Sequence, residues 1–296
     1  MNYFSNIEYL FLYLCCFSSF LLWVIQSKKP ALFIAFIAIT LGFFFKSIYY
    51  PSLIIVLIFF LLCKLFTKIS EFNLKKFIFL GIIFFLISII MTRKIPFSNE
   101  IPIFTNIQLS EISSQFSMGI NLEKFICALI MASFLIPLAR SWMEWKTIFK
   151  EFFFPFIILT LILITPAILT HFVKFNFKIS MNTILFSLDS LFVVSFAEEV
   201  FFRGFLQNNI QLIMDKLFIN KNKIVYILPI LISSIIFAMF HLYGGYLLAA
   251  FAFIASIFYG YAYQKSSKIE SAILVHFCFN LVHFVFFTYP SYYHVK

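Results

Sequence analysis

Long runs of apolar residues, separated by short clusters of charged, Pro, Gly and Asn residues, make up almost the whole chain. A membrane-spanning helix needs about 20 mostly apolar residues, and the interruptions separate about ten such runs. The pattern therefore predicts an all-α fold, a polytopic transmembrane helical bundle. The predicted spans are residues 7–26, 31–46, 51–67, 76–92, 122–139, 152–173, 182–206, 225–242, 246–263 and 269–289.

The composition agrees with this pattern and excludes a soluble globular protein. Of the 296 residues, 63% are hydrophobic and only 11% are charged, and the mean hydropathy is +1.02. Such values are typical of a chain that meets lipid along most of its length. We therefore expect a multi-pass integral membrane protein. Its expected location is a prokaryotic plasma (inner) membrane.

Lys and Arg are distributed unevenly between the predicted loops. With the first span starting outside, the inside loops hold about twice as many of these residues as the outside loops, which favours both termini on the outer side. The net charge of +10 then reflects topology and contact with lipid headgroups. Membrane lipid is an expected partner, and nucleic acid is not.

The longest polar stretch lies between residues 94 and 123. Within it, "IQLSEISSQF" at 107–116 is predicted to lie as a short interfacial helix. We find no internal repeat, which argues against a transporter built from two matched halves.

Charged and polar residues within the later apolar runs point to a site. Ionisable groups at membrane depth cost at least about 2.5 kcal/mol each, so they usually face a bundle interior or a water-filled cavity. The candidates fall on three predicted helices or their ends: Asp189, Glu198, Glu199, Arg203, His241, His276, Asn280 and His283.

Three of these residues are adjacent or one helical turn apart. Glu199 and Arg203 are four residues apart, so they share a helical face and are predicted to form an ion pair. Glu198 lies about 100° around the helix from Glu199 and faces a different direction. A carboxylate in an apolar site suits a general base, but spacing alone leaves a structural role for Glu198 equally open.

The last predicted helix carries a second polar face. His276 and Asn280 are four residues apart and are able to donate to a developing oxyanion from one side of the helix. His283 falls near the same face and is expected to pack behind the site. His241 is the single candidate on its predicted helix. It is a candidate site residue only because the neighbouring helices also carry polar residues.

Three short motifs follow one another along the chain. They are Glu-Glu-x-x-x-Arg in "EEVFFRG" at 198–204, Phe-x-x-x-His in "FAMFH" at 237–241 and His-x-x-x-Asn in "HFCFN" at 276–280. In this order, on successive predicted helices, they resemble the CPBP family of intramembrane endopeptidases. That family includes type II CAAX prenyl proteases and bacteriocin-processing or immunity proteins. The resemblance covers roughly residues 150–290.

The resemblance implies a site and a reaction. Glu198 would activate the attacking water with help from His241, while His276 and Asn280 would stabilise the tetrahedral oxyanion. The reaction would be peptide-bond hydrolysis in a membrane-associated protein or peptide substrate, without a covalent acyl-enzyme. Two residues would support the site: Glu199 and Arg203.

Zinc is the alternative to metal-free chemistry. Glu198, His241 and His276 form a plausible ligand set for a catalytic zinc ion with an open fourth position. We expect no cofactor, because Asn280 fits an oxyanion role better than a zinc-ligand role. The motifs HExxH, Gly-x-Gly-Asp and Gly-x-Ser, which mark other intramembrane protease classes, are not found.

The predicted topology places two candidate site residues at different depths in the membrane. With the helix that carries Glu198 running inward and the next running outward, Glu198 and His241 differ in depth by roughly 15 Å. We expect the turn "HLYGGY" to lie within the membrane, where its glycines permit a tight reversal.

Three functional classes are compared. The leading hypothesis is an intramembrane endopeptidase with accessory helices of unknown role in residues 1–150 and a CPBP-like catalytic core in residues 151–296. A non-catalytic immunity or scaffold protein of the same fold is the second. A proton-coupled transporter using Asp189 and Glu198 is the third; Asp189 has no role in the protease hypothesis.

Overall fold

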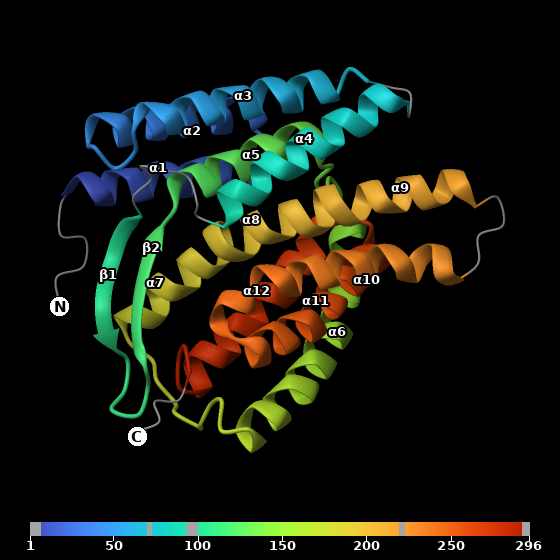
Figure 1. Cartoon of the computed structure of the whole chain (residues 1–296). Coiled ribbons are helices and arrows are strands. Elements are labelled where there is room, and N and C mark those ends of the chain that lie inside the picture. The colour runs from blue at the N-terminus through green and yellow to red at the C-terminus, as the bar shows by residue number, and fades with distance from the viewer. Residues whose placement is uncertain (1–6, 70–72, 93–99, 219–222, 292–296) are drawn as a thin grey trace. The chain divides into compact units, whose positions relative to one another are not determined.

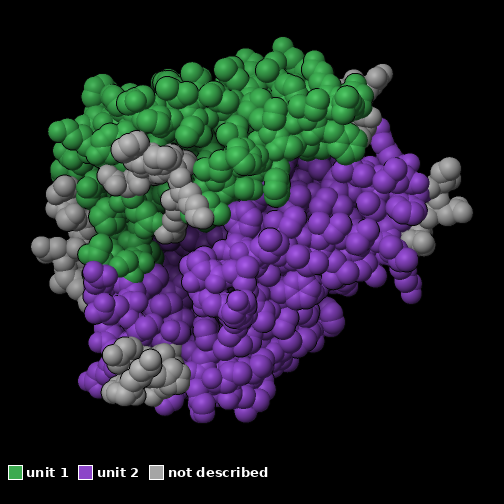
Figure 2. Space-filling view, in the orientation of Figure 1, with its two compact units in different colours: residues 1–105, 117–137 green, residues 106–116, 138–296 purple. Residues whose placement is uncertain are grey.

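The computed structural model describes residues 7–69, 73–92, 100–218 and 223–291. The chain forms two compact units, residues 1–105 with 117–137 and residues 106–116 with 138–296 (Figure 2). The unit boundary after residue 137 differs from the expected functional boundary at residue 150, and the division by function stays a prediction. Every candidate site residue belongs to unit 2, which positions the site.

Unit 1 is built around one buried helix. Its core is α5 (Leu122–Leu135), which contacts each of the four other helices of the unit. Nearly every α5 residue is buried, as expected for a helix with neighbours on all sides. The surrounding helices are α1 (Ile7–Val24), α2 (Lys28–Phe44), α3 (Tyr50–Phe66) and α4 (Leu74–Met91).

A β-hairpin replaces the interfacial helix expected at 107–116. Strands β1 (Ile101–Gln108) and β2 (Gln115–Ile120) pair with each other (Figure 1). The Ser113 hydroxyl accepts the Ser110 backbone N–H at 3.0 Å and closes the turn between them. The helix prediction is wrong because β-branched residues, which favour strands, alternate along β1. These residues are Ile101, Ile103, Thr105 and Ile107.

One continuous helix, residues 181–217, carries the first motif. It passes through α7 (Met181–Asp189), the π-helical η1 (Ser190–Ser195), α8 (Phe196–Glu199), the π-helical η2 (Val200–Gln207) and α9 (Asn208–Leu217). The segment contains no proline and a single glycine, so little in its sequence breaks a helix. The wide π-helical turns flank the adjacent carboxylates Glu198 and Glu199, and such turns are frequent at functional sites.

Four further helices complete unit 2. They are α6 (Trp142–Leu169), α10 (Lys223–Phe240), α11 (Tyr246–Ser266) and α12 (Ile269–Phe286). α11 packs against α6, α10 and α12, and η2 contacts α10, α11 and α12. The three motif-bearing helices are therefore neighbours in space.

The turn between α10 and α11 has the tight form expected of "HLYGGY". A 3₁₀ turn, η3 (Leu242–Gly244), follows His241, and Gly245 adopts φ of 96°. This left-handed conformation favours glycine, because a Cβ atom would be strained there. Within the protein itself, Tyr243 and Tyr246 are each 88% exposed.

Backbone hydrogen bonds join the segment that precedes α7 to the end of α12. We call these bonds, between residues 174–178 and 285–288, the clasp. Asn176 N–H donates to the Phe286 carbonyl at 2.8 Å, and Thr288 N–H donates to the Lys174 carbonyl at 2.9 Å. The Phe186 and Phe284 rings stack with centroids 4.0 Å apart. α7 and α12 are thus held side by side, so that their polar residues meet further along both helices.

The all-α polytopic fold is confirmed, with the β-hairpin as an addition. In the part of the chain that the structure describes, six helices are long and apolar enough to cross a membrane: α1, α4, α6, α10, α11 and α12. The number of about ten spans stays a prediction. The sidedness of the termini concerns residues 1–6 and 292–296, which lie outside the described residues.

Candidate active site

A buried ion pair lies at the centre of unit 2. Arg203 binds Glu199 through two contacts, Nε to Oε2 at 3.1 Å and Nη1 to Oε1 at 3.3 Å. Both side chains are fully buried. The i, i+4 spacing predicted this pair. Nη1 donates a hydrogen bond to Oε1, whereas Nε and Oε2 are close in distance but form no hydrogen bond, so attraction between the charges offsets the cost of burying them only in part. The role of these two residues in supporting the site stays a prediction.

Arg203 is held by more than its carboxylate. Its Nη2 donates to the Ser256 carbonyl at 2.9 Å and to the Ser256 hydroxyl at 2.6 Å. The guanidinium carbon lies 5.0 Å from the Phe237 ring centroid and 5.3 Å from that of Tyr259, within cation–π range. Helices α10 and α11 therefore both contribute to fixing the arginine.

His276 of α12 completes this buried centre. Its Nδ1 lies 2.7 Å from Glu199 Oε1, and its ring stacks on that of Tyr259 with centroids 4.5 Å apart and an interplanar angle of 12°. The contact with Glu199 fixes the ring orientation and leaves Nε2 on the opposite edge. The sequence placed His276 in the site but did not identify Glu199 as its partner.

Glu198 differs from its neighbour in exposure. It is half-buried, whereas Glu199 is fully buried, as expected of adjacent residues that face different sides of a helix. Burial raises the pKa of the Tyr289 phenol, and Asp189, Tyr243 and Glu198 raise it further. Glu198 is therefore one of the charged groups that act on the Tyr289 phenol.

His241 follows the last residue of α10 and is close to this centre. Its Nδ1 lies 2.8 Å from the Phe237 carbonyl, and its ring stacks on Phe237 with centroids 4.5 Å apart. Phe237 also meets the His276 ring edge-on at 6.1 Å. One phenylalanine therefore contacts both histidines.

Ring contacts between η2 and α10 resolve the expected difference in depth. Phe202 lies 4.8 Å from Phe237 and 5.5 Å from Phe240, and Phe201 lies 6.0 Å from Phe240. The end of α10 is thus level with the turn that follows Glu198. The roughly 15 Å offset expected from topology does not occur, because the long helix continues to residue 217 and α10 returns beside it.

Asn280 lies one helical turn beyond His276 on α12. Its Nδ2 lies 3.5 Å from the Ser190 hydroxyl, at the outer limit of a hydrogen bond. Asn280 and Ser190 are both on elements that pack together, α12 and η1. The amide is therefore only loosely held and is available to a second acceptor.

His283 lies apart from the buried centre, at the clasp end of unit 2. Its ring packs against Tyr289 with centroids 5.0 Å apart, and its expected role behind the site stays a prediction. Lys178 lies nearby, with its Nζ donating to the Phe287 carbonyl and sitting 5.4 Å from the Phe284 ring centroid. Burial lowers the pKa of Lys178 to about 8.

Sequence reasoning missed two site residues, Ser256 and Tyr259, and gave Asp189 no role in the protease hypothesis. Ser256 and Tyr259 are three residues apart on α11 and buried, in a stretch without charged residues. Polar side chains one turn apart on an apolar helix were the available signal. Asp189 is buried at the end of α7, beside the serine that meets Asn280.

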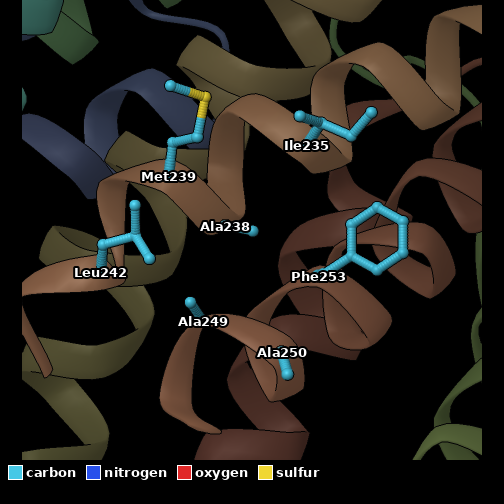
Figure 3. A pocket seen from close by; sticks show the side chains of 7 residues that line it. All are labelled: Ile235, Ala238, Met239, Leu242, Ala249, Ala250 and Phe253. Atoms are coloured by element: carbon cyan, nitrogen blue, oxygen red, sulfur yellow. The ribbon is translucent and has the colours of Figure 1, made fainter. Parts of the chain in front are cut away.

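An apolar pocket of about 330 Å³ lies between α10 and α11. Its lining includes Met239 and Leu242, on either side of His241 in the sequence, and Figure 3 shows its apolar side chains facing the space between the two helices. The lining carries no group that transfers protons. The pocket is therefore not the candidate catalytic centre.

A zinc site would need three ligand side chains close together. Among the described residues, no group of three or more His, Cys, Asp and Glu side chains is arranged to hold a metal ion. The set of Glu198, His241 and His276 is included in that statement. One nitrogen of His276 is already bound to Glu199. The other ring nitrogen, Nε2, is not used by this contact, and the choice between zinc and metal-free chemistry stays a prediction.

These features define a multi-pass integral membrane protein with a polar site buried among its helices. Residues 180–282 match the family model of the type II CAAX prenyl endopeptidase Rce1-like proteins. This match agrees with the resemblance drawn from the three motifs, and the chain is similar over these residues to a family of intramembrane CAAX-type endopeptidases. The matched segment contains all three motifs. No curated protein and no solved structure matches the chain.

Proposed function

We propose that the protein is an intramembrane endopeptidase in which Glu198 activates water with the help of His241. His276 and Asn280 stabilise the oxyanion that forms when the water attacks the peptide carbonyl. The observation that carries this proposal is the contact between His276 Nδ1 and Glu199 Oε1 at 2.7 Å. This contact fixes the imidazole of His276 through Glu199. The adjacent residue on the long helix, Glu198, is half-buried and faces a different side of that helix.

One carboxylate, that of Glu198, serves first as the base and then as the acid of the reaction. Glu198 takes a proton from water as the oxygen bonds to the carbonyl carbon, which creates the tetrahedral oxyanion. When the C–N bond breaks, the proton passes from Glu198 to the departing amine. No protein atom becomes covalently attached to the substrate.

The tautomer of His276 determines what it does in this scheme. Donation of Nδ1–H to Glu199 leaves Nε2 as an acceptor in the neutral ring, so Nε2 donates to an oxyanion only when the ring is an imidazolium. The Glu199 carboxylate stabilises that form, as a buried carboxylate does for a catalytic histidine. Arg203 in turn neutralises part of the charge of Glu199.

The substrate class follows from the location of the site. A polar centre enclosed by apolar helices suits a protein or peptide whose scissile bond lies in or next to the membrane. We place the protein in a prokaryotic plasma membrane, with lipid and such a substrate as its partners.

Asn280→Ala is expected to lower kcat about 100-fold with little change in KM, because the lost amide acts on the oxyanion and not on the bound substrate. The measurement is cleavage of a membrane-associated reporter peptide by the purified protein in liposomes. Cys278→Ala, on the same helix, is the matched control and should retain activity. Equal activities of the two variants would contradict the role of Asn280.

Chelation is expected to leave cleavage unchanged, since no metal takes part in the proposed mechanism. The purified protein is incubated with 1,10-phenanthroline and assayed with the same reporter, and a non-chelating phenanthroline isomer serves as the control. Loss of activity that added zinc restores would refute the metal-free mechanism.

A further inference from the structure

Three polar contacts join the long helix to α11 at regular intervals. Arg203 Nη2 donates to Ser256, Gln207 Nε2 donates to the Gly260 carbonyl at 3.0 Å, and Gln264 Nε2 donates to Gln211 Oε1 at 3.1 Å. In each pair the two residues are 53 positions apart in the chain. We call this set of contacts the polar ladder.

The constant separation shows that the two helices run parallel and in register. On each helix the ladder residues are four positions apart, so each contact lies about one turn, or 5.4 Å, from the next. A further bond, from Gln207 Nε2 to Gln264 Oε1 at 3.2 Å, links the second contact to the third. The ladder therefore extends from the buried arginine toward the far end of α9.

Gly260 permits the close approach that the second contact requires. A Cβ atom at this position would lie 2.8 Å from Gln207 Oε1 and 3.0 Å from Ile230 Cγ2. The absence of a side chain leaves its carbonyl open to Gln207, which is itself buried. The interface combines a small residue and polar contacts, which are the features that bring helices together in lipid.

Register matters because apolar packing alone specifies it weakly. The rest of α11 is largely apolar, and lipid supplies no hydrophobic drive that favours one axial position of a helix over another. A slip of one turn would place Arg203 opposite Ala252 or Gly260 and remove its hydroxyl partner. The buried glutamines would then lose their partners, at a cost for each group left unsatisfied.

The register also sets the position of the proposed catalytic histidine. Tyr259, one residue before Gly260, stacks on His276 and faces Arg203. A slip of one turn moves Tyr259 by about 5.4 Å along the axis, which removes the surface against which the imidazole rests. We propose that Gln207, Gln211 and Gln264 are positioning residues that hold α11 at the depth where Tyr259 orients His276. This inference rests on the proposed function.

Gln207→Leu tests the ladder through activity. It is expected to lower kcat about tenfold and to leave KM within about twofold, because misorientation affects the transition state more than substrate binding. Asn209→Leu is the matched control: Asn209 is buried on the same helix, but its amide donates to the Phe205 carbonyl of that helix at 2.7 Å. This control should retain activity within about twofold of the original protein.

Cross-linking tests the register without reference to activity. In the full chain with its native cysteines replaced, Gln211→Cys with Gln264→Cys is expected to form a disulfide, because these side chains face each other and the contacts of Arg203 with Ser256 and of Gln207 with Gly260 remain to hold the register. Asp215→Cys with Gln264→Cys reports a slip of one turn. Adding Gln207→Leu should lower the yield of the first pair and raise that of the second.

The outcomes separate the ladder from the proposed function. Suppose first that the original protein cleaves the peptide. Either an unchanged kcat in Gln207→Leu or equal losses of kcat in Gln207→Leu and Asn209→Leu then overturns the positioning role. The proposed function stands in both cases. Failure of the 211–264 pair to link overturns the register. A protein that cleaves no peptide overturns the proposed function, and with it the positioning role, while the cross-link still decides the register.

Discussion

Replacing Glu198 with Gln is expected to lower kcat by at least about 1,000-fold, close to complete loss of peptide cleavage. Glutamine matches the size of glutamate and preserves local packing, but its amide takes no proton from water. The measurement is single-turnover cleavage of the membrane-associated reporter peptide by the purified variant. Single turnover isolates the chemical step from product release.

A matched substitution makes this result specific. Glu151→Gln alters another half-buried glutamate of unit 2, on α6, and should leave cleavage close to that of the original protein. The thermal stability of both variants is measured in the same detergent. Cleavage retained in Glu198→Gln would show that another group activates the water and would overturn the proposed mechanism.

Replacing Arg203 with Leu is expected to destabilise the fold by about 3–5 kcal/mol. The substitution leaves Glu199 fully buried beside an apolar side chain, with its charge compensated only by the contact with His276. Ser256 also loses the donor to its carbonyl and hydroxyl. The measurement is the unfolding midpoint of the purified protein in detergent, which should fall by many degrees.

The double variant Glu199→Gln with Arg203→Leu separates stability from catalysis. Removing the charge of Glu199 should restore most of the lost stability, because no unpaired carboxylate remains. Activity should stay low, since the imidazolium form of His276 loses its stabilising carboxylate. A double variant as unstable as Arg203→Leu alone would contradict the view that the uncompensated charge is the cause.

Contacts within one helix turn could be predicted from the sequence. The pairing of Glu199 with Arg203 depends only on i, i+4 geometry, which tolerates the presence of π-helical turns. The positions of the helices, though not their ends, could likewise be predicted from the apolar runs, since each predicted span overlaps a helix in the structure. In both cases the information lies within a few neighbouring residues.

Contacts between helices could not be predicted in this way. The bond from His276 to Glu199 joins residues 77 positions apart, and it depends on how α12 packs against the long helix. The depth estimate for His241 failed for a different reason: it assumed that each helix ends where its apolar run ends, whereas the long helix continues to Leu217. The hairpin at 101–120 was missed because the alternation of β-branched residues covers β1 alone, and the hairpin depends on the pairing of β1 with the second short strand, β2.

The π-helical turns on both sides of Glu198 and Glu199 have a consequence for changes in chain length. Each such turn holds more residues than an α-helical turn, so deletion of one residue from η1 or η2 would return that turn to α-helical winding. The residues on the two sides of that turn would keep their angular relation, because a π-helical turn accommodates one extra residue between α-helical turns. A deletion from the regular α-helix α9 before Gln211 has no such turn to absorb it and would rotate Gln211 by about 100° relative to the carboxylates. The long helix should therefore tolerate the loss of one residue within η1 or η2 better than the loss of one residue from the start of α9.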